Sequence, residues 1–178
     1  MKVVVFTGLP WSGKSEAVAV AKQMGIPIFR MGDMVWEETK KKGLELNDDN
    51  VGTIANDMRK EHGRDIWANR TIEKIKEAKN SNILVIDGVR NLDEIETFKR
   101  KLGDDFLLVA IHVSDELRYK RALERGRKDD SRDIVKIKAR DHREIGWGLN
   151  MVISSADIVI QNEGSLEELQ KKVKQIFV

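Results

Sequence analysis

The chain has 178 residues, of which 40% are hydrophobic and 35% are charged, and its formal net charge is only +2. This length and composition are typical of one globular domain with a single core, and the small net charge gives no global argument for nucleic-acid binding. The lack of cysteine excludes disulfides and cysteine-type zinc sites. No apolar run approaches the roughly 20 residues of a membrane span, and no signal peptide is visible. We therefore expect a cytoplasmic protein without membrane partners.

The first predicted element is a buried strand over residues 2–7, and the most specific motif of the chain follows it. Residues 8–15 match the G-x-x-x-x-G-K-S pattern of a P-loop, and a predicted helix over residues 16–24 comes next. In such a loop the backbone N–H groups hold phosphate oxygens, Lys14 reaches the β- and γ-phosphates, and the Ser15 hydroxyl binds Mg²⁺. We therefore predict that ATP and Mg²⁺ are held by Gly8, Leu9, Pro10, Trp11, Ser12, Gly13, Lys14 and Ser15.

Four further apolar segments have the length and composition of strands, and helical patterns lie between them. Alternation of this kind predicts parallel β-α units with right-handed crossovers, and therefore an α/β fold. The four predicted strands cover residues 26–30, 82–87, 105–113 and 157–161.

Three of the intervening helices have recognisable start signals. Asn91 can cap a helix that ends at Gly103, and Ser114 can cap the next one. Ser165 and Glu168 have the spacing of a capping box at the start of the last helix. In that helix we expect four apolar residues to face the sheet, namely Leu166, Leu169, Val173 and Ile176.

Residues 31–78 form a long, polar and helical segment without a strand. A crossover between parallel strands needs about a dozen residues, whereas this segment has nearly fifty. Ligands of open α/β sheets bind beyond the carboxyl ends of the strands. We therefore predict that this segment is an insertion on the ligand side of the sheet.

The chain resembles the P-loop nucleoside-monophosphate kinase superfamily in four segments besides its tail. The P-loop is the first, and Met31-Gly32-Asp33-Met34 is similar to the start of the acceptor-binding helix of adenylate kinases. Residues 83–90, Ile-Leu-Val-Ile-Asp-Gly-Val-Arg, are similar to the Asp-Gly-x-Pro-Arg of adenylate kinases and the Asp-x-Arg of dephospho-CoA-type kinases. Residues 121–132 resemble a compact lid, and residues 156–166 resemble the last strand and turn of dephospho-CoA kinases. The best overall match is an archaeal group described as adenylate-kinase-like or related to dephospho-CoA kinase.

The resemblance implies a P-loop NTPase three-layer sandwich, with a five-stranded parallel sheet in the order 2-3-1-4-5 and helices on both faces. It implies a single domain over residues 1–178, with an acceptor-binding insertion at about 31–78 and a short lid at about 121–143. The implied function is an ATP-dependent phosphotransferase that transfers the γ-phosphate to a nucleoside monophosphate or dephospho-CoA. The alternative is a nucleotide-binding regulatory protein or RNA-associated ATPase without a small-molecule acceptor. We do not expect nucleic acid as a partner, and a monomer and a homodimer both stay open.

Four residues of the insertion are candidates for contacts to the acceptor. Asp33 could orient an acceptor hydroxyl or take its proton, and it could equally be a helix N-cap. Trp36 could stack on a base or serve packing, and it stands where adenylate kinases have an arginine that holds the acceptor phosphate. Arg59 and Arg64 could hold an acceptor phosphate, although exposed arginines are common in such segments.

Asp87 and Arg90 follow the predicted strand at residues 82–87. Asp87 ends this apolar run directly before a glycine, as a Walker-B-type carboxylate does, and we assign it to the Mg²⁺ shell through water. The alternative role of Asp87 is to form a turn or a cap. Arg90 should point into the same cleft and bind phosphate through its guanidinium, or else it faces solvent.

Basic residues are concentrated in the stretch 118–143, which has eleven Lys or Arg against five Asp or Glu and thus a net charge of +6. Arg121 and Arg125 share a helix face, and Arg132 follows a polar break suited to a hinge. We predict that closure of this lid brings these three arginines onto the transferring phosphoryl group, with Arg127 as a further candidate. Asn162 follows the last strand, where the loop of this superfamily packs beside adenine.

Overall fold

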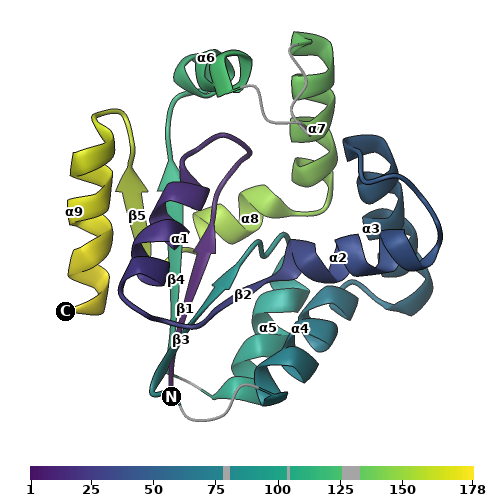
Figure 1. The fold of residues 1–178 in the computed structure, drawn as a ribbon, viewed down its shortest axis with the longest axis horizontal. Helices are drawn as coiled ribbons and strands as arrows, with labels where there is room; N and C mark the ends of the chain where they lie inside the picture. Colours follow the sequence, from purple (N-terminus) through teal and green to yellow (C-terminus); the bar gives the residue numbers. More distant parts are fainter. Residues whose placement is uncertain (78–80, 104, 126–132) are drawn as a thin grey trace.

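The computed structural model describes residues 1–77, 81–103, 105–125 and 133–178 (Figure 1). Five parallel strands form one sheet in the order β2-β3-β1-β4-β5, which confirms the predicted order. The strands are β1 (Lys2–Thr7), β2 (Ile28–Arg30), β3 (Ile83–Asp87), β4 (Phe106–His112) and β5 (Ile158–Gln161).

Helices connect the strands and cover both faces of the sheet (Figure 1). Three of them, α2, α3 and α4, follow one another between β2 and β3, with no strand among residues 31–77. The expected helical insertion is therefore present. The helices of the described residues are α1 (Lys14–Gln23), α2 (Met31–Lys41), α3 (Asp48–His62), α4 (Ile66–Glu77), α5 (Leu92–Leu102), α6 (Asp115–Arg125), α7 (Ile134–Gly146), α8 (Leu149–Ser154) and α9 (Leu166–Phe177).

The central strand explains why the fold has three layers. Successive side chains of a strand point to opposite faces of the sheet. In β1, Val3 and Val5 belong to the apolar core under α4 and α5, whereas Val4 and Phe6 belong to the core under α1 and α9. All four side chains are fully buried, so β1 is hydrophobic without alternation, as a strand covered on both faces should be.

The insertion divides into two parts. Helix α4 packs against α5, and its residues Trp67, Ile72 and Ile75 lie in the core beneath the sheet. Helices α2 and α3 project instead beyond the carboxyl ends of the strands (Figure 1). The projecting part stands on the ligand side, whereas the apolar face of α4 packs mainly in the core beneath the sheet. No helix in the described ranges has the length and apolar character needed to cross a bilayer.

Most predicted boundaries agree with the structure, and three details differ. Strand β2 begins at Ile28 rather than at residue 26, since Pro27 has no N–H to donate to a ladder. The Ser114 hydroxyl donates to Glu163, a contact that was not predicted, and α6 begins at the next residue. The prediction that Leu166 faces the sheet is wrong. Leu166 is 50% exposed and lines a cleft, because the first turn of α9 lies at the rim of the sheet.

Candidate active site

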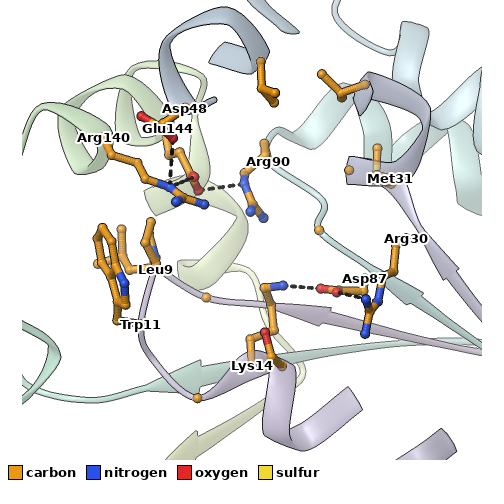
Figure 2. Close-up of a pocket in the computed structure, with 18 of the residues that line it drawn as sticks. Leu9, Trp11, Lys14, Arg30, Met31, Asp48, Asp87, Arg90, Arg140 and Glu144 are labelled. Carbon is orange, nitrogen blue, oxygen red and sulfur yellow. Dashed lines mark hydrogen bonds and ion pairs between the residues drawn. The ribbon is translucent and has the colours of Figure 1, made fainter. Parts of the chain in front are cut away.

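A cleft of about 700 Å³ opens at the carboxyl ends of the strands. Its floor is the P-loop with the end of β3, and its walls come from α2 and α3 on one side and from α7 on the other (Figure 2). This volume is within the range of pockets that enclose small-molecule ligands. The position is the one that open α/β sheets use for ligands.

The two glycines of the P-loop are so closely surrounded that neither position has room for a side chain. Gly8 has a φ of +152°, and a Cβ there would lie 2.6 Å from the carbonyl oxygen of Ile111. Gly13 has a φ of +99°, and a Cβ there would lie 2.2 Å from Nδ2 of Asn162. Trp11 also has a positive φ, of 62°, which is costly for a residue with a side chain. The loop therefore requires its surroundings to hold it.

Two buried side chains outside the loop supply that support. Nδ2 of Asn162 donates to the backbone oxygen of Ser12 at 2.8 Å, so Asn162 contacts the loop itself as well as lining the cleft. Arg118 donates to the backbone oxygen of Pro10 at 3.1 Å and is fixed by Asp141 at 2.6 and 2.9 Å. This role of Arg118 was not predicted, because in the sequence Arg118 is only one of eleven basic residues in the stretch 118–143.

Lys14 and Asp87 face each other at the floor of the cleft and form an ion pair (Figure 2). Asp87 is buried at the end of β3, and Nε of Arg30 lies 4.0 Å from its other oxygen. Burial lowers the pKa of Lys14, and the nearby Arg90 lowers it further, whereas Asp87 acts in the opposite direction. A basic group in such a place is poised to exchange its carboxylate partner for phosphate oxygens.

The metal-binding prediction can be tested against the donor set. Mg²⁺ is usually bound through one or two carboxylates plus the phosphates of a substrate, and it keeps several waters. Ser15 and Asp87 both line the cleft, and the described residues contain no group of three or more His, Asp or Glu that could hold a metal by itself. The residues present fit an Mg²⁺ ion that arrives with ATP.

Asp33 lies in the first turn of α2 and lines the cleft beside the same floor. Partial burial raises the pKa of Asp33 above its usual value of 3.8; Arg30 opposes this rise and Asp87 adds to it. No side-chain hydrogen bond caps the helix, so the prediction that Asp33 is an N-cap is not supported. Its carboxylate is available to a molecule in the cleft.

The wall formed by α7 carries a network of ion pairs that reaches α3. Oε2 of Glu144 lies 2.8 Å from Nε of Arg90, and Oε1 accepts a hydrogen bond from Nε of Arg140 at 3.3 Å. Asp48, at the start of α3, accepts two hydrogen bonds of 2.8 Å from Nη2 of Arg143. Helices α7 and α3 therefore meet over the cleft through charged groups (Figure 2).

Arg59 is the most deeply buried of the predicted acceptor-binding arginines. Its Nη2 donates to Oε1 of Glu94 at 3.0 Å, and its guanidinium carbon lies 4.4 Å from the centre of the Trp147 ring. Burial lowers its pKa despite the pair with Glu94. Within the described part of the chain, Nε and Nη1 of Arg59 have no hydrogen-bond partner.

The remaining predicted residues divide into three groups. Trp36, 44% exposed, and Arg121 line the cleft, and Arg121 also donates to the backbone oxygen of Asn162 at 2.9 Å. Arg64 does not line the cleft, because it pairs with Asp93 at 2.8 Å on the outer surface. The side chain of Arg125 and the whole of Arg127 and Arg132 lie outside the described residues.

Several residues of the site were not predicted. Asp48, Arg140, Arg143 and Glu144 all line the cleft. Their sequence signal is weak, since only the i,i+4 spacing of Arg140 and Glu144 indicates a pair, and such pairs are common on exposed helices. What makes them part of a site is the approach of α7 to α3, which local sequence does not specify.

Comparisons with known proteins identify relatives of the chain. The family described as an AAA domain matches residues 7–138. The UPF0200 protein of Methanosarcina barkeri is 43% identical over 177 residues, which are 99% of this chain and 95% of that protein. The UPF0200/UPF0201 protein of Archaeoglobus fulgidus is 44% identical over 179 residues, which are all of this chain and 55% of that protein.

Solved structures extend the likeness to the fold. The crystal structure of shikimate kinase from Bacteroides thetaiotaomicron superposes with a TM-score of 0.60 at 14% sequence identity, covering 99% of this chain and 98% of that chain. At such low identity the likeness concerns the fold alone, and it agrees with the P-loop kinase fold expected from the sequence. The chain therefore belongs to the AAA domain family and to the UPF0200 proteins, and it shares its fold with a shikimate kinase.

Proposed function

We propose that the protein transfers the γ-phosphate of ATP to a small nucleotide-like acceptor, either a nucleoside monophosphate or dephospho-CoA. The observation that carries this proposal is the opposition of two groups of residues across one cleft. Lys14 and Asp87 lie at its floor, and the guanidinium groups of Arg59 and Arg90 line its walls. A donor site and an anion-binding acceptor site thus share one enclosed space.

Phosphoryl transfer needs alignment and neutralisation of charge more than covalent help. The bond from the γ-phosphorus to ADP breaks as a bond to an acceptor oxygen forms. Lys14 exchanges its ion pair with Asp87 for phosphate oxygens of ATP. Mg²⁺, held by Ser15 and Asp87, supplies further neutralisation when it is bound.

The acceptor lies between α2, α3 and the loop after β3. If the acceptor atom is a hydroxyl oxygen, Asp33 takes its proton, and if it is a phosphate oxygen, no base is needed. Arg59 and Arg90 supply charge for an anionic acceptor, and Trp36 offers a partly exposed ring at the mouth. Support for this arrangement comes from the cleft lining and from the fold shared with a shikimate kinase.

The test is a transfer assay with purified protein, ATP and Mg²⁺ against a panel of nucleoside monophosphates, nucleosides, dephospho-CoA and pantetheine derivatives, together with calorimetry of ATP binding. We expect ATP binding and transfer to one class of acceptor. Lys14→Ala should abolish both, because it removes the fixed charge of the P-loop. Lys22→Ala, which removes an exposed lysine from the same helix, is the matched control.

Two results would contradict the proposal. Unchanged ATP affinity in Lys14→Ala would exclude the P-loop as the donor site. ATP hydrolysis that no small molecule changes but RNA stimulates would instead support an RNA-associated ATPase of the same fold.

A further inference from the structure

Glu144 is a buried carboxylate in the wall of the cleft, only 4% exposed. A carboxylate in such a place is costly unless cations compensate for the lost water. Burial raises the pKa of Glu144, but Arg90 and Arg140 together with Lys14 outweigh this effect and lower it below its usual value. Glu144 is therefore ionised at neutral pH, and its charge is shared between Arg90 and Arg140.

Arg90 is restrained on three sides. Its Nε lies 2.8 Å from Glu144, its Nη1 donates to the backbone oxygen of Val89 at 3.2 Å, and its backbone N–H donates to Glu94 at 2.7 Å. Among the described residues, Nη2 has no partner. Figure 2 shows the Arg90 guanidinium between Glu144 and the Lys14–Asp87 pair. One end of this side chain is thus fixed and the other end is open to the cleft.

Arg140 lies on the P-loop side of Glu144. Its guanidinium carbon is 5.3 Å from the centre of the Trp11 ring, and its Nε is 3.6 Å from Oδ1 of Asp48. Arg140 comes from α7 and Arg90 from the loop after β3, so Glu144 is the point at which two separate elements are joined. We call Arg90, Arg140 and Glu144 the arginine bracket.

Resting on the proposed function, we propose that Glu144 is a positioning residue that holds Arg90 and Arg140 as preorganised cations on two sides of the phosphoryl group in transfer. Charge in that transition state is spread over the equatorial oxygens, so cations already held in place stabilise it without reorganisation. Without Glu144, both side chains would lose their shared anchor. The bracket would also tie the position of α7 to the loop that follows β3.

The test uses ADP, Mg²⁺ and fluoroaluminate, which together imitate the planar phosphoryl group and need no knowledge of the acceptor. Calorimetry measures the affinity for ADP·Mg²⁺ with and without fluoroaluminate. We call the ratio of these two affinities the gain. For the parent protein we expect a clear gain. Glu144→Gln keeps the size of the side chain and removes its charge, so it should reduce the gain by about 10- to 100-fold while leaving ADP affinity within about twofold.

Three companion variants separate positioning from packing. Glu144→Asp retains the charge and should recover part of the gain. Glu144→Gln added to Arg90→Gln should cost little more than Arg90→Gln alone, because residues that act as a unit are not additive. Glu38→Gln makes the same chemical change at a partly buried carboxylate that pairs with Arg70 at 2.7 Å and does not line the cleft. It controls for lost stability and should preserve the gain.

The outcomes distinguish this inference from the proposed function. If the parent does not bind ADP·Mg²⁺, the proposed function fails. If the parent binds ADP·Mg²⁺ but shows no gain, or if Glu144→Gln retains the full gain, the arginine bracket is overturned while the nucleotide site stands. A loss of gain in Glu38→Gln as large as in Glu144→Gln would assign the effect to stability and overturn the role of Glu144.

Discussion

Gly13 is the residue of the P-loop at which backbone strain and crowding coincide. An alanine there would have to adopt a φ of +99°, and its Cβ would meet Asn162 at 2.2 Å. We expect Gly13→Ala to lower the free energy of unfolding by more than the about 1 kcal/mol that a left-handed conformation costs a residue with a Cβ. It should also abolish ATP binding, because the loop would move away from Asn162. Chemical denaturation and calorimetry measure the two effects.

Gly25 offers the matched control for this prediction. Its φ of +74° is also in the left-handed region, but nothing lies within 4 Å of a Cβ placed there. Gly25→Ala should therefore show the backbone cost of about 1 kcal/mol without any change in ATP affinity. Equal loss of ATP binding in both variants would mean that strain alone, and not the contact with Asn162, controls the loop.

Asp33 provides a prediction about pH. Because its pKa is raised above 3.8, a reaction that uses its carboxylate should slow as the pH falls, with a midpoint above that value. Asp33→Asn should remove this acidic limb and lower kcat by about 100-fold or more for a hydroxyl acceptor. The measurement is the pH dependence of kcat/KM for the acceptor found in the panel assay.

The direction of a second substitution checks the cause. Glu37, exposed on the same helix, adds to the rise in the pKa of Asp33 through its negative charge. Glu37→Gln should shift the acidic limb slightly to lower pH without changing the plateau. An acidic limb that persists unchanged in Asp33→Asn would show that another group titrates.

Single residues also show where sequence reasoning works and where it stops. Lys14, Ser15 and Asp87 were predictable because each has a fixed place relative to the end of a buried strand. The pair Asp48–Arg143 was not, since its members are 95 positions apart and meet only through packing of α3 against α7. Arg59 and Arg64 are both arginines of the insertion, and the sequence does not distinguish them. Only Arg59 lines the cleft.

At the scale of elements, the contact between α3 and α7 depends on a glycine. Gly52 is buried in α3, and a Cβ there would lie 2.7 Å from the guanidinium carbon of Arg143. Gly52→Ala should gain about 0.8–1 kcal/mol of helix propensity and lose the packing of Arg143, so the free energy of unfolding should change little. Because Arg143 would be displaced from Asp48, we expect KM for the acceptor to rise.

Gly146, at the exposed end of α7, is the comparison for that change, since nothing lies within 4 Å of its Cβ position. Gly146→Ala should stabilise the protein by about 0.5–1 kcal/mol at most and leave KM unaltered. If Gly52→Ala also leaves KM unaltered, the contact between Arg143 and Asp48 does not shape the acceptor site.

The elements themselves were largely predictable. Asn91 and Ser165 form the capping boxes that their spacing indicates, because a cap is satisfied within one turn of its own helix. The strand order followed from the family resemblance, since no local pattern specifies which strands are neighbours. Leu166 shows the limit of periodicity, which places a residue on a helix face but does not say where the sheet beneath that face ends.

At the scale of the whole molecule, the cleft joins the P-loop after β1, the end of β3, and α2, α3 and α7. A ligand that bridges elements from both halves of the sheet should stabilise the folded chain as one unit. Binding of ATP·Mg²⁺ at 100 times its Kd adds about 2.7 kcal/mol to the free energy of unfolding. For a chain of this size that corresponds to a rise in Tm of about 5–10 °C.

Thermal unfolding with increasing ATP·Mg²⁺ measures this effect, and its dependence on concentration identifies it as binding rather than as an effect of ionic strength. Lys14→Ala should show no rise, whereas Lys22→Ala should behave like the parent, because Lys22 contributes equal charge to the protein but lies at the far end of α1. Sodium chloride at matched ionic strength should not reproduce the rise. A shift of the same size in Lys14→Ala would place nucleotide binding outside the cleft. The presence of Lys14, Asp87, Arg59 and Arg90 in one cleft would then no longer support phosphoryl transfer there.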